Sequence, residues 1–386
     1  MSRVTILHSC QIWLPQTQTW MYSQVAELQR LGLDVHVACE RTENLDQFAI
    51  LNIHCLANEP KWRQILDRSL RMLRIRRHLN HLVSVGKEVG AEIIHSHFGH
   101  IGWRNLGAVR ALDAKHVVTF YGLDVNKLPT QYPAWQRRYR QLFDEVDLIL
   151  CEGSYMAKCI VALGCATEKV KVQHLGIDVD HIEFRPRQWQ LGQPLKVLIA
   201  ASFREKKGIP YAIEALRLLR KDVKVELTII GDAGRDLASK REKQNIHAAL
   251  KHSGLASDVH LLGYQPHEVL LREAYLHHVF LSPSITASDG DTEGGAPVSL
   301  IEMAATGMPI VSTTHCDIPE IVQHGVTGLL ASEHDIDSLA CHLRWYAENP
   351  GQWEGMLASG RRHVEQEYGL QAQGEKLVAH YQALLE

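Results

Sequence analysis

Two carboxylates and a glycine-rich loop stand close together in the segment EGGAPVSLIEMAATGMPIVS at 293–312. Glu293 opens the loop, and Glu302 follows inside an apolar run. The pattern predicts a loop, a helix that stops at Gly307 and Pro309, and then a strand. Glycines let backbone amides approach a ligand, and the start of a helix favours an anion. The segment therefore suits a phosphate or a sugar phosphate, with both acids accepting hydrogen bonds from sugar hydroxyls.

Histidine and tyrosine side chains follow two strand-like runs in the first half of the chain. The run IIHSHFGHIGW at 93–103 places His95, His97 and His100 at a strand end and in the following loop. VTFYGLDV at 118–125 places Tyr121 and Asp124 after another strand. Open α/β sheets place ligand groups after the carboxyl ends of strands, so these residues are candidates for binding or catalysis. For a lone histidine the alternative is a core residue with satisfied hydrogen bonds, and both interpretations stay open for His97.

Composition limits the classes of protein to consider. The chain has 386 residues, 45% hydrophobic and 22% charged, with a formal net charge of −3. This length predicts two domains, and the charge gives no reason to expect a nucleic-acid partner. Eight cysteines include no CxxC pair and no zinc spacing, which favours reduced, buried thiols. No apolar run suits a signal peptide or a membrane span, so we expect a cytoplasmic location.

Short β-rich runs alternate with longer amphipathic runs along the whole chain. Such alternation predicts parallel, doubly wound sheets covered by helices. The irregular segment 178–194 divides the chain, so we expect an α/β protein with two Rossmann-like domains facing a cleft. The predicted strands are Val4–His8, Asp34–Cys39, Glu92–His95, His116–Phe120, Leu148–Cys151, Val170–His174, Lys196–Ala200, Glu226–Gly231, Val259–Leu262, Val279–Ser282 and Ile310–Ser312. The predicted helices are Met21–Leu31, Trp62–Val89, Trp103–Leu112 and Ser154–Leu163.

Several of these segments together resemble a known enzyme family. EGGAPVSLIEMAATGMPIVST at 293–313, SFREKKGIPYAIEAL at 202–216 and HLGID at 174–178 are similar to retaining family-four glycosyltransferases of the GT-B fold, the type found in bacterial polysaccharide synthesis. TIIGDAG at 228–234, VHLLGYQP at 259–266 and DIPEIVQHGVTGLL at 317–330 also fit, so the resemblance covers nearly the whole chain. It implies an acceptor-binding domain at 1–182, a donor-binding domain at 183–366, and a last helix at 367–386 that returns to the first domain.

The resemblance assigns the two acids to the donor, a nucleotide-diphosphate sugar. Family members separate the two acids by seven residues, and the second acid, which contacts the ribose, matches Glu302. Glu293 lies nine positions before Glu302 and Gly294 eight, so the loop has one extra residue, which we expect the pair Gly294–Gly295 to absorb. Ala296 in this loop and Tyr264 in VHLLGYQP complete the expected donor site.

The resemblance also places two cations against the donor diphosphate. Lys207, followed by Gly208, matches the family lysine, whereas Ser202 stands at the usual arginine position and Arg204 lies two residues later. Two cations suit a leaving group whose negative charge grows as the glycosidic bond breaks. They would also replace a metal ion, so we expect no cofactor. The pair Asp289 and Asp291 resembles the divalent-metal site of the other large glycosyltransferase fold, but its place directly before the Glu293 loop in the second domain favours a solvated loop.

In the first domain the resemblance implies an acceptor site, with a saccharide or a lipid-linked saccharide as the partner. Relatives often have a histidine where this chain has Tyr121, which removes a neutral base and raises the weight on His97. Asp124 follows in the same motif, and the loop LPQTQTW at 14–20 offers Thr17 or Thr19. The expected catalytic residues are therefore His97, Tyr121, Arg204 and Lys207, and the expected acceptor ligands are Thr17, Thr19 and Asp124.

A basic amphipathic segment, residues 61–78, adds a separate signal. It has seven basic residues and one acid, with Trp62, Ile65 and Leu66 beginning an apolar stripe. Such helices dock on anionic lipid surfaces, here the inner face of a membrane. The alternative is a helix whose stripe packs on the domain core while its arginines stay in solvent. Two other functions also remain open, a nucleotide-sugar epimerase of the same fold and a non-catalytic sugar-binding protein.

Overall fold

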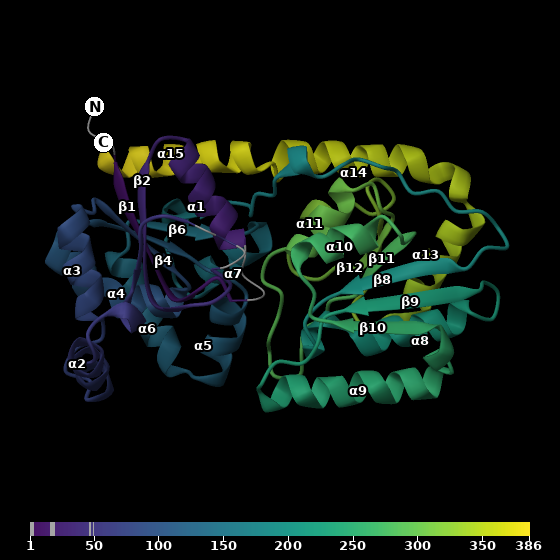
Figure 1. Cartoon of the computed structure of the whole chain (residues 1–386), viewed down its shortest axis with the longest axis horizontal. Coiled ribbons are helices and arrows are strands. Elements are labelled where there is room, and N and C mark those ends of the chain that lie inside the picture. Colours follow the sequence, from purple (N-terminus) through teal and green to yellow (C-terminus); the bar gives the residue numbers. More distant parts are fainter. Residues whose placement is uncertain (1–3, 16–19, 46–47, 49) are drawn as a thin grey trace. The chain divides into compact units, whose positions relative to one another are not determined.

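The computed structural model describes residues 4–15, 20–45, 48 and 50–386. The chain folds into two compact units, drawn in Figure 1. Unit 1 comprises Met1–Gly176 and Leu370–Glu386, and unit 2 comprises Ile177–Gly369. The last segment of the chain thus belongs to the first unit.

Unit 1 is built on a parallel sheet, and in the described residues its strand order is β3-β2-β1-β4-β5-β6-β7. Neighbouring residues on a strand face opposite cores. Ile6 packs beneath α1 (Trp20–Arg30) and α15 (Leu370–Leu385), whereas Leu7 packs beneath α3 (Asn80–Val89) and α4 (Gly99–Leu112). The sheet is therefore covered by helices on both faces, as the unbroken apolar strands predicted. Its strands are β1 (Thr5–Trp13), β2 (Asp34–Thr42), β3 (Ile53–Cys55), β4 (Ile93–His97), β5 (Lys115–Thr119), β6 (Leu148–Cys151) and β7 (Val170–Val172).

The remaining helices of unit 1 follow the strands in turn. They are α2 (Lys61–Met72), α3 (Asn80–Val89), α4 (Gly99–Leu112), α5 (Leu128–Gln131), α6 (Ala134–Glu145) and α7 (Ser154–Ala162). Short 3-10 turns occupy Leu56–Asn58, Thr167–Lys169 and, in unit 2, Val179–His181, and a π turn occupies Leu123–Lys127. None of the helices in the described ranges is long and apolar enough to cross a membrane.

The prediction of one helix over Trp62–Val89 is wrong. The chain breaks after α2, where Arg74 takes a left-handed backbone conformation with φ of 58°. The buried carboxylate of Asp67 then caps the start of α3, because it accepts the backbone N–H groups of Asn80 at 2.8 Å and His81 at 2.9 Å. These bonds satisfy donors that a helix start leaves unpaired, and they hold α2 and α3 as two separate helices.

Unit 2 repeats the architecture with the strand order β10-β9-β8-β11-β12-β13 in a parallel sheet. Val197 and Leu198, adjacent on β8, again belong to cores on opposite faces. Its strands are β8 (Leu195–Ala200), β9 (Val225–Ile230), β10 (Val259–Gly263), β11 (Val279–Ser282), β12 (Ile310–Thr313) and β13 (Leu329–Ala331). Its helices are α8 (Ile209–Leu219), α9 (Leu237–Ser253), α10 (His267–Ala274), α11 (Val298–Ala305), α12 (Ile318–Ile321), α13 (Ile336–Glu348) and α14 (Trp353–Glu367), with 3-10 turns at Glu205–Lys207, Ala256–Asp258 and Pro350–Gln352. The predicted fold class, two doubly wound parallel α/β domains, is confirmed.

The segment 178–194 is not a free connection. The guanidinium of Arg187 is buried in unit 2, where it donates to the carbonyl oxygens of Ala274 at 2.9 Å and Thr306 at 3.1 Å. A buried guanidinium that satisfies two helix carboxyl ends fastens the segment to the unit. The segment belongs to unit 2, which begins at residue 177.

Candidate functional site

Charged side chains of unit 2 gather where its strand order reverses. β8 has β9 on one side and β11 on the other, so the loops that follow β8 and β11 leave the sheet toward opposite faces. A crevice at such a point is where open α/β sheets bind ligands. Lys207 comes from the loop after β8, and Glu293 comes from the loop after β11.

Glu293 and Lys207 form a buried ion pair. The ammonium nitrogen of Lys207 lies 2.8 Å from each carboxylate oxygen of Glu293, whose side chain is 6% exposed. The hydroxyl of Ser284 donates to the same carboxylate at 2.7 Å. Burial alone would raise the pKa of Glu293, but Lys207, Lys206 and these hydrogen bonds outweigh it and hold the pKa at about 2. The carboxylate is therefore ionised and fixed in place at neutral pH.

The backbone of the Glu293 loop is held from the neighbouring strand end. The N–H of Glu293 donates to Nε2 of His315 at 3.1 Å, and Nδ1 of His315 lies 2.7 Å from Glu333. The carboxylate of Glu333 also accepts the backbone N–H of Thr286 at 2.7 Å. Because His315 accepts through Nε2, its proton lies on Nδ1, toward Glu333. This support was not predicted, although His315 and Glu333 each follow a strand end that could have drawn attention to them.

Lys206 occupies the space beside the pair Asp289 and Asp291. Its ammonium lies 3.3 Å from Asp291 and 2.7 Å from the carbonyl oxygen of Thr292. Asp289 accepts the backbone N–H of Asp291 at 3.0 Å, as in a turn. In the described part of the chain these two acids do not belong to a group of three potential metal ligands. A lysine against Asp291 thus competes with the metal-site interpretation of this pair.

Glu302 lies on α11 with its carboxylate nearly buried. His267, at the start of α10, places Nε2 at 2.7 Å from that carboxylate. The hydrogen bond to Glu302 raises the pKa of His267. The carboxylate of Glu302 is therefore held by a hydrogen bond to His267. His267 was not predicted from the sequence.

Arg204 stands at a more exposed place than Lys207. Its guanidinium forms two hydrogen bonds to Asp236, of 3.0 and 2.8 Å, and the two side chains are 39% and 44% exposed. Tyr264, directly after β10, is 41% exposed, and burial raises its pKa while the charge of Arg204 opposes that shift. Both residues follow the carboxyl ends of strands of unit 2, as Lys207 does, but both are in contact with solvent.

Glycine is needed at two turns of this site. Gly208 has φ of 61°, and a Cβ there would lie 1.9 Å from the carbonyl oxygen of Pro283. The loops after β8 and β11 therefore touch at a point where no other residue fits. Gly294 has φ of 81°, so the loop after Glu293 uses the conformational freedom expected of the glycine pair, and Gly295 and Ala296 follow it in buried positions.

In unit 1 the predicted residues His97 and Tyr121 lie inside the protein. Nε2 of His97 lies 2.9 Å from Nδ1 of His8, and Nδ1 of His97 lies 2.7 Å from the Tyr121 hydroxyl. Burial lowers the pKa of His97 to about 3, and burial followed by the charge of His97 lowers the pKa of His8. The pKa of Tyr121 is raised well above its usual value by burial first. His8, His97 and Tyr121 thus form a hydrogen-bonded row that is electrically neutral at pH 7.

His8, His95 and His97 form the one group in the described residues whose ligand atoms are close enough to share a metal ion. His95 already has both ring nitrogens in hydrogen bonds, to Tyr381 of α15 at 2.6 Å and to Thr119 at 2.7 Å. His97 has both engaged as well, so Nε2 of His8 is the nitrogen of the group without a partner. Because a metal ligand needs a free lone pair, this hydrogen bonding describes a structural network.

Asp124 is fully buried. Its two carboxylate oxygens accept the backbone N–H groups of Gly99 at 2.5 Å and Tyr121 at 2.8 Å. Burial raises the pKa of Asp124 to about 7 against the opposing effect of these bonds. Asp124 thus joins the start of α4 to the end of β5, and its predicted contact with an acceptor stays a prediction. Thr17 and Thr19 lie outside the described residues.

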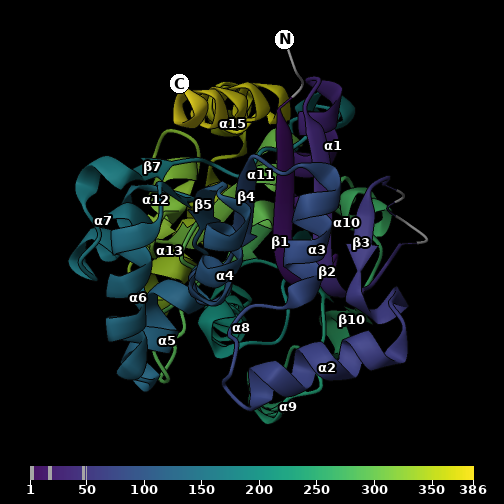
Figure 2. The ribbon, with the colours of Figure 1, turned by 90° about the vertical axis from the view of Figure 1, so that its left-hand side faces the viewer.

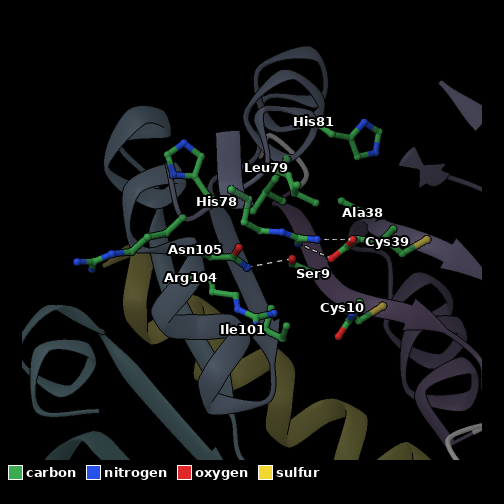
Figure 3. Close-up of a pocket in the computed structure, with 15 residues that line it drawn as sticks. Ser9, Cys10, Ala38, Cys39, His78, Leu79, His81, Ile101, Arg104 and Asn105 are labelled. Carbon is green, nitrogen blue, oxygen red and sulfur yellow. Dashed lines mark hydrogen bonds and ion pairs between the residues drawn. The ribbon is translucent and has the colours of Figure 1, made fainter. Parts of the chain in front are cut away.

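Unit 1 also has an open pocket with an empty volume of about 430 Å³. Its wall comes from β1, the end of β2, the turn before α3, and α4 (Figure 3). Asn105 of α4 donates to Ser9 of β1 at 3.0 Å, and Arg71 of α2 binds both oxygens of Glu40 at 2.6 and 2.9 Å. The pairing of β1 with β4 ends at Ser9 and Ser96, so the pocket opens where the strand order of this sheet reverses.

Two sequence families match the two halves of the chain. Residues 17–181 match "Glycosyltransferase Family 4", and residues 181–363 match "Glycosyl transferases group 1". An amylovoran biosynthesis glycosyltransferase of Erwinia amylovora is 34% identical over 285 residues, which cover 73% of this chain and 68% of that protein. A putative colanic acid biosynthesis glycosyltransferase of Escherichia coli is 32% identical over 304 residues, 76% of this chain and 71% of the relative. The chain belongs to the family-4 glycosyltransferases.

Solved structures agree on the architecture. The Anabaena protein HepE, determined in complex with UDP and glucose, aligns with a TM-score of 0.78 at 18% identity, covering 99% of this chain and 100% of that one. Sucrose-phosphate synthase from Thermosynechococcus elongatus aligns with a TM-score of 0.79 at 16% identity, covering 99% of each chain. At these identities the likeness establishes the GT-B fold, as the sequence predicted.

Proposed function

We propose that this glycosyltransferase moves a sugar from a nucleotide-diphosphate sugar to a saccharide or lipid-linked saccharide in the synthesis of a cell-surface polysaccharide. The observation that carries the proposal is the buried pair of Lys207 and Glu293 at the strand reversal of unit 2. The polysaccharide assignment draws on the two bacterial relatives above, and the nucleotide sugar draws on the UDP complex of HepE.

The donor would lie along the loops of unit 2. Lys207 has three ammonium hydrogens, so it can hold Glu293 and still donate to a phosphate oxygen. The ionised Glu293 can accept a hydroxyl of the sugar, and Glu302 a hydroxyl of the ribose. Arg204, which is more exposed, would add a second cation to the diphosphate as its charge grows. In unit 1, His97 and Tyr121 would shape the acceptor side as neutral hydrogen-bonding groups.

Release of a nucleoside diphosphate tests this function. A panel of nucleotide sugars is incubated with the enzyme, with and without candidate acceptors, and the nucleoside diphosphate released is measured. We expect release that depends on the acceptor. An epimerase would convert the donor without an acceptor and release no nucleoside diphosphate, and a binding protein would do neither, so either result would overturn the proposal.

Two finer properties belong to the proposal. We expect retention of the anomeric configuration, which NMR of the first product would reveal. We also expect metal independence, because Lys206 contacts Asp291 and Lys207 contacts Glu293, and these ammonium groups would take the place of a metal ion at the diphosphate. Full activity in EDTA supports this, and a strict requirement for magnesium or manganese would contradict it.

The second part of the proposal is that α2 docks on an anionic membrane surface. Its polar face is the one fastened to unit 1, since Gln64 donates to the carbonyl oxygen of Glu59 at 2.8 Å, Asp67 caps α3, and Arg71 binds Glu40. These three residues follow one another at helical spacing, so the opposite face of α2 must point outward. In Figure 2, α2 lies at the outside of the unit.

The outward face of α2 is apolar. Trp62, Ile65 and Leu66 are 62%, 64% and 49% exposed, and Leu73 at the end of the helix is 64% exposed. These four side chains therefore do not pack on the domain core, whereas Leu70 and Leu79 of the same stripe are half-buried. Exposed Lys61 and Arg68 lie along one edge of the stripe. An apolar face bordered by cations fits the boundary between anionic head groups and acyl chains.

Vesicle flotation tests the docking of α2. We expect the protein to float with phosphatidylglycerol-containing vesicles at low salt and to lose most of the association at high salt. The double variant Trp62→Ser/Leu66→Ser should reduce partitioning at least tenfold, whereas Leu191→Ser/Leu237→Ser, which changes two exposed side chains of unit 2, should not. Equal flotation of both variants would contradict the proposal, as would a dimer that dissociates in the α2 variant without any vesicle binding.

A further inference from the structure

One cation in the pocket of unit 1 has no partner. Arg104, on α4, is half-buried, and within the described residues its guanidinium makes no hydrogen bond and no ion pair. Figure 3 labels it on the wall that α4 contributes. A guanidinium has five donors, and leaving all of them unpaired in a half-buried place costs stability unless a ligand supplies the acceptors.

The charge of the pocket wall is also unbalanced. Three arginines line it, and the carboxylate of Glu40 is fully engaged by Arg71. Besides Arg71 and Arg104, Arg77 lines the pocket. Its guanidinium stacks on the ring of Trp103 at 4.3 Å and donates to Gln141, so it is not paired with a carboxylate. Two positive charges therefore remain without counter-charges. Burial, and then the charge of Arg71, lowers the pKa of Arg104, which fits a site that stabilises an anion when one binds.

The position of this pocket suits a substrate. It opens past the last pair of β1 and β4, at the strand reversal of unit 1, where an open α/β sheet binds ligands. Ser9 and Asn105 add a hydroxyl and an amide beside the cations. Arg71 belongs to α2, so the pocket borders the helix whose apolar face points outward.

We propose that this pocket binds an anionic oxyacid group of the acceptor through the guanidinium of Arg104. The Arg71–Glu40 ion pair fixes the pocket wall in place, and the charge of Arg77 attracts the anion at longer range. A planar guanidinium takes two oxygens of one phosphate or carboxylate. The inference rests on the proposed function, in which unit 1 receives the acceptor. Two sources supply such a group, the phosphate of a polyprenyl-diphosphate-linked saccharide and the carboxylate of an acidic sugar.

Calorimetric titration of the full chain tests the pocket, with geranyl diphosphate as the phosphate probe and a glucuronate-terminated disaccharide as the carboxylate probe. We expect one probe to bind, and Arg104→Gln to weaken that binding about tenfold or more. Arg104→Lys, which keeps the charge but loses the planar fork, should fall between. Arg138→Gln is the matched control, because it removes a neighbouring cation that does not line the pocket.

Binding of the probe must depend on Arg104 and not on Lys207. Loss of probe binding in Lys207→Ala together with unchanged binding in Arg104→Gln would place the probe in unit 2 and overturn the inference. Failure of both probes to bind the wild-type chain would overturn it too. Nucleoside diphosphate binding, measured in the same variants, tests the donor site separately. If that binding is absent while the probe still depends on Arg104, the donor proposal fails and this one stands.

Discussion

At the strand reversal of unit 2 the chain places a buried ion pair, whereas at the strand reversal of unit 1 it places both a row of neutral rings and a pocket lined by arginines. Lys207 and Glu293 form a buried pair in the first case, and His8, His97 and Tyr121 form a hydrogen-bonded row in the second. The two sheets are alike in their parallel strands and in their cover of helices. The residues on and directly after the strands therefore decide the chemistry, and the sheet brings them together.

This difference matches the ligands proposed for each unit. A diphosphate carries charge that grows during transfer, and a fixed ammonium stabilises that charge without reorganisation. A sugar hydroxyl is neutral and needs no fixed charge. Because both ring nitrogens of His97 are engaged within the protein, the row would support the acceptor side and not bind the hydroxyl itself. Arg104 lines a pocket whose lining residues do not include His97 or Tyr121, so unit 1 is not neutral throughout.

The largest expected effect comes from breaking the ion pair of unit 2. Lys207→Ala should lower kcat/KM about 10²–10³-fold, because the leaving diphosphate loses its buried cation. It should also lower the free energy of unfolding by about 3 kcal/mol, since the buried Glu293 keeps only Lys206 at 4.0 Å and the hydroxyl of Ser284 as partners. Steady-state kinetics and urea unfolding measure the two effects.

The double variant Lys207→Met/Glu293→Gln separates stability from function. Removing both charges should restore most of the unfolding free energy and leave activity low. Recovery of activity in the double variant would mean that the pair is structural and that the donor binds elsewhere.

Glu302→Ala should have the next largest effect. Loss of a charge-assisted hydrogen bond to the ribose should weaken donor binding by about 1.5–3 kcal/mol, roughly 10–100-fold. His267→Ala, which removes the neighbour of Glu302 and leaves the carboxylate, serves as the comparison and should weaken binding less. Fluorescence titration with the nucleotide sugar measures both. Unchanged affinity in Glu302→Ala would remove Glu302 from the donor site.

Mild acid should distinguish the two units. His97 has a folded pKa of about 3, below its unfolded value near 6.5, so the unfolded chain binds more protons below pH 6.5 and unit 1 loses stability as the pH falls. The slope approaches about 1.4 kcal/mol per pH unit for each such histidine. Glu293, with a folded pKa of about 2, contributes stability that is kept down to its unfolded value near 4.5 and is lost below it.

Hydrogen exchange at pH 7 and pH 5 measures this contrast within one chain. We expect the strands of unit 1 to lose more protection than those of unit 2 on acidification. His97→Gln should reduce the pH dependence of unit 1, whose other buried histidines keep the rest of it, while His252→Gln, at an exposed position of unit 2, should leave it unchanged. Equal losses in both units would show that the buried histidine row is not the cause.

The smallest effect is expected at Arg204. Its pair with Asp236 is largely exposed, so Arg204→Ala should change the unfolding free energy by less than about 1 kcal/mol. Activity should fall about tenfold, well short of the loss at Lys207. A loss as large as that of Lys207→Ala would give Arg204 the leading role at the diphosphate.

Much of the fold could be predicted because strands and helices carry strong local patterns. The bounds of β6 and β11 match the prediction residue for residue, since turn residues flank short apolar runs. The break between α2 and α3 was missed because residues 73–79 contain no glycine or proline. The contacts of Asp67 with the start of α3 create that break, and they are tertiary. β3 and β13, of three residues each, were missed, whereas the equally short β7 was predicted as part of Val170–His174.

The candidate site was predicted in part for a similar reason. Lys207, Glu293 and Glu302 stand in motifs, and the structure places Lys207 against Glu293. Ser284, His315 and Lys206 act through contacts between loops that are distant in sequence, so no local pattern reveals them. Burial is equally invisible to a motif, and it is burial that makes His97, Tyr121 and Asp124 interior residues.

The central claim is that Glu293 and Lys207 hold different parts of one donor. Calorimetric titration of Glu293→Gln with a nucleoside diphosphate, and then with the corresponding nucleotide sugar, tests it most directly. We predict that the variant binds the nucleoside diphosphate within about threefold of the wild-type affinity but loses about tenfold or more for the nucleotide sugar. Equal losses for the two ligands, or no loss for either, would contradict the account.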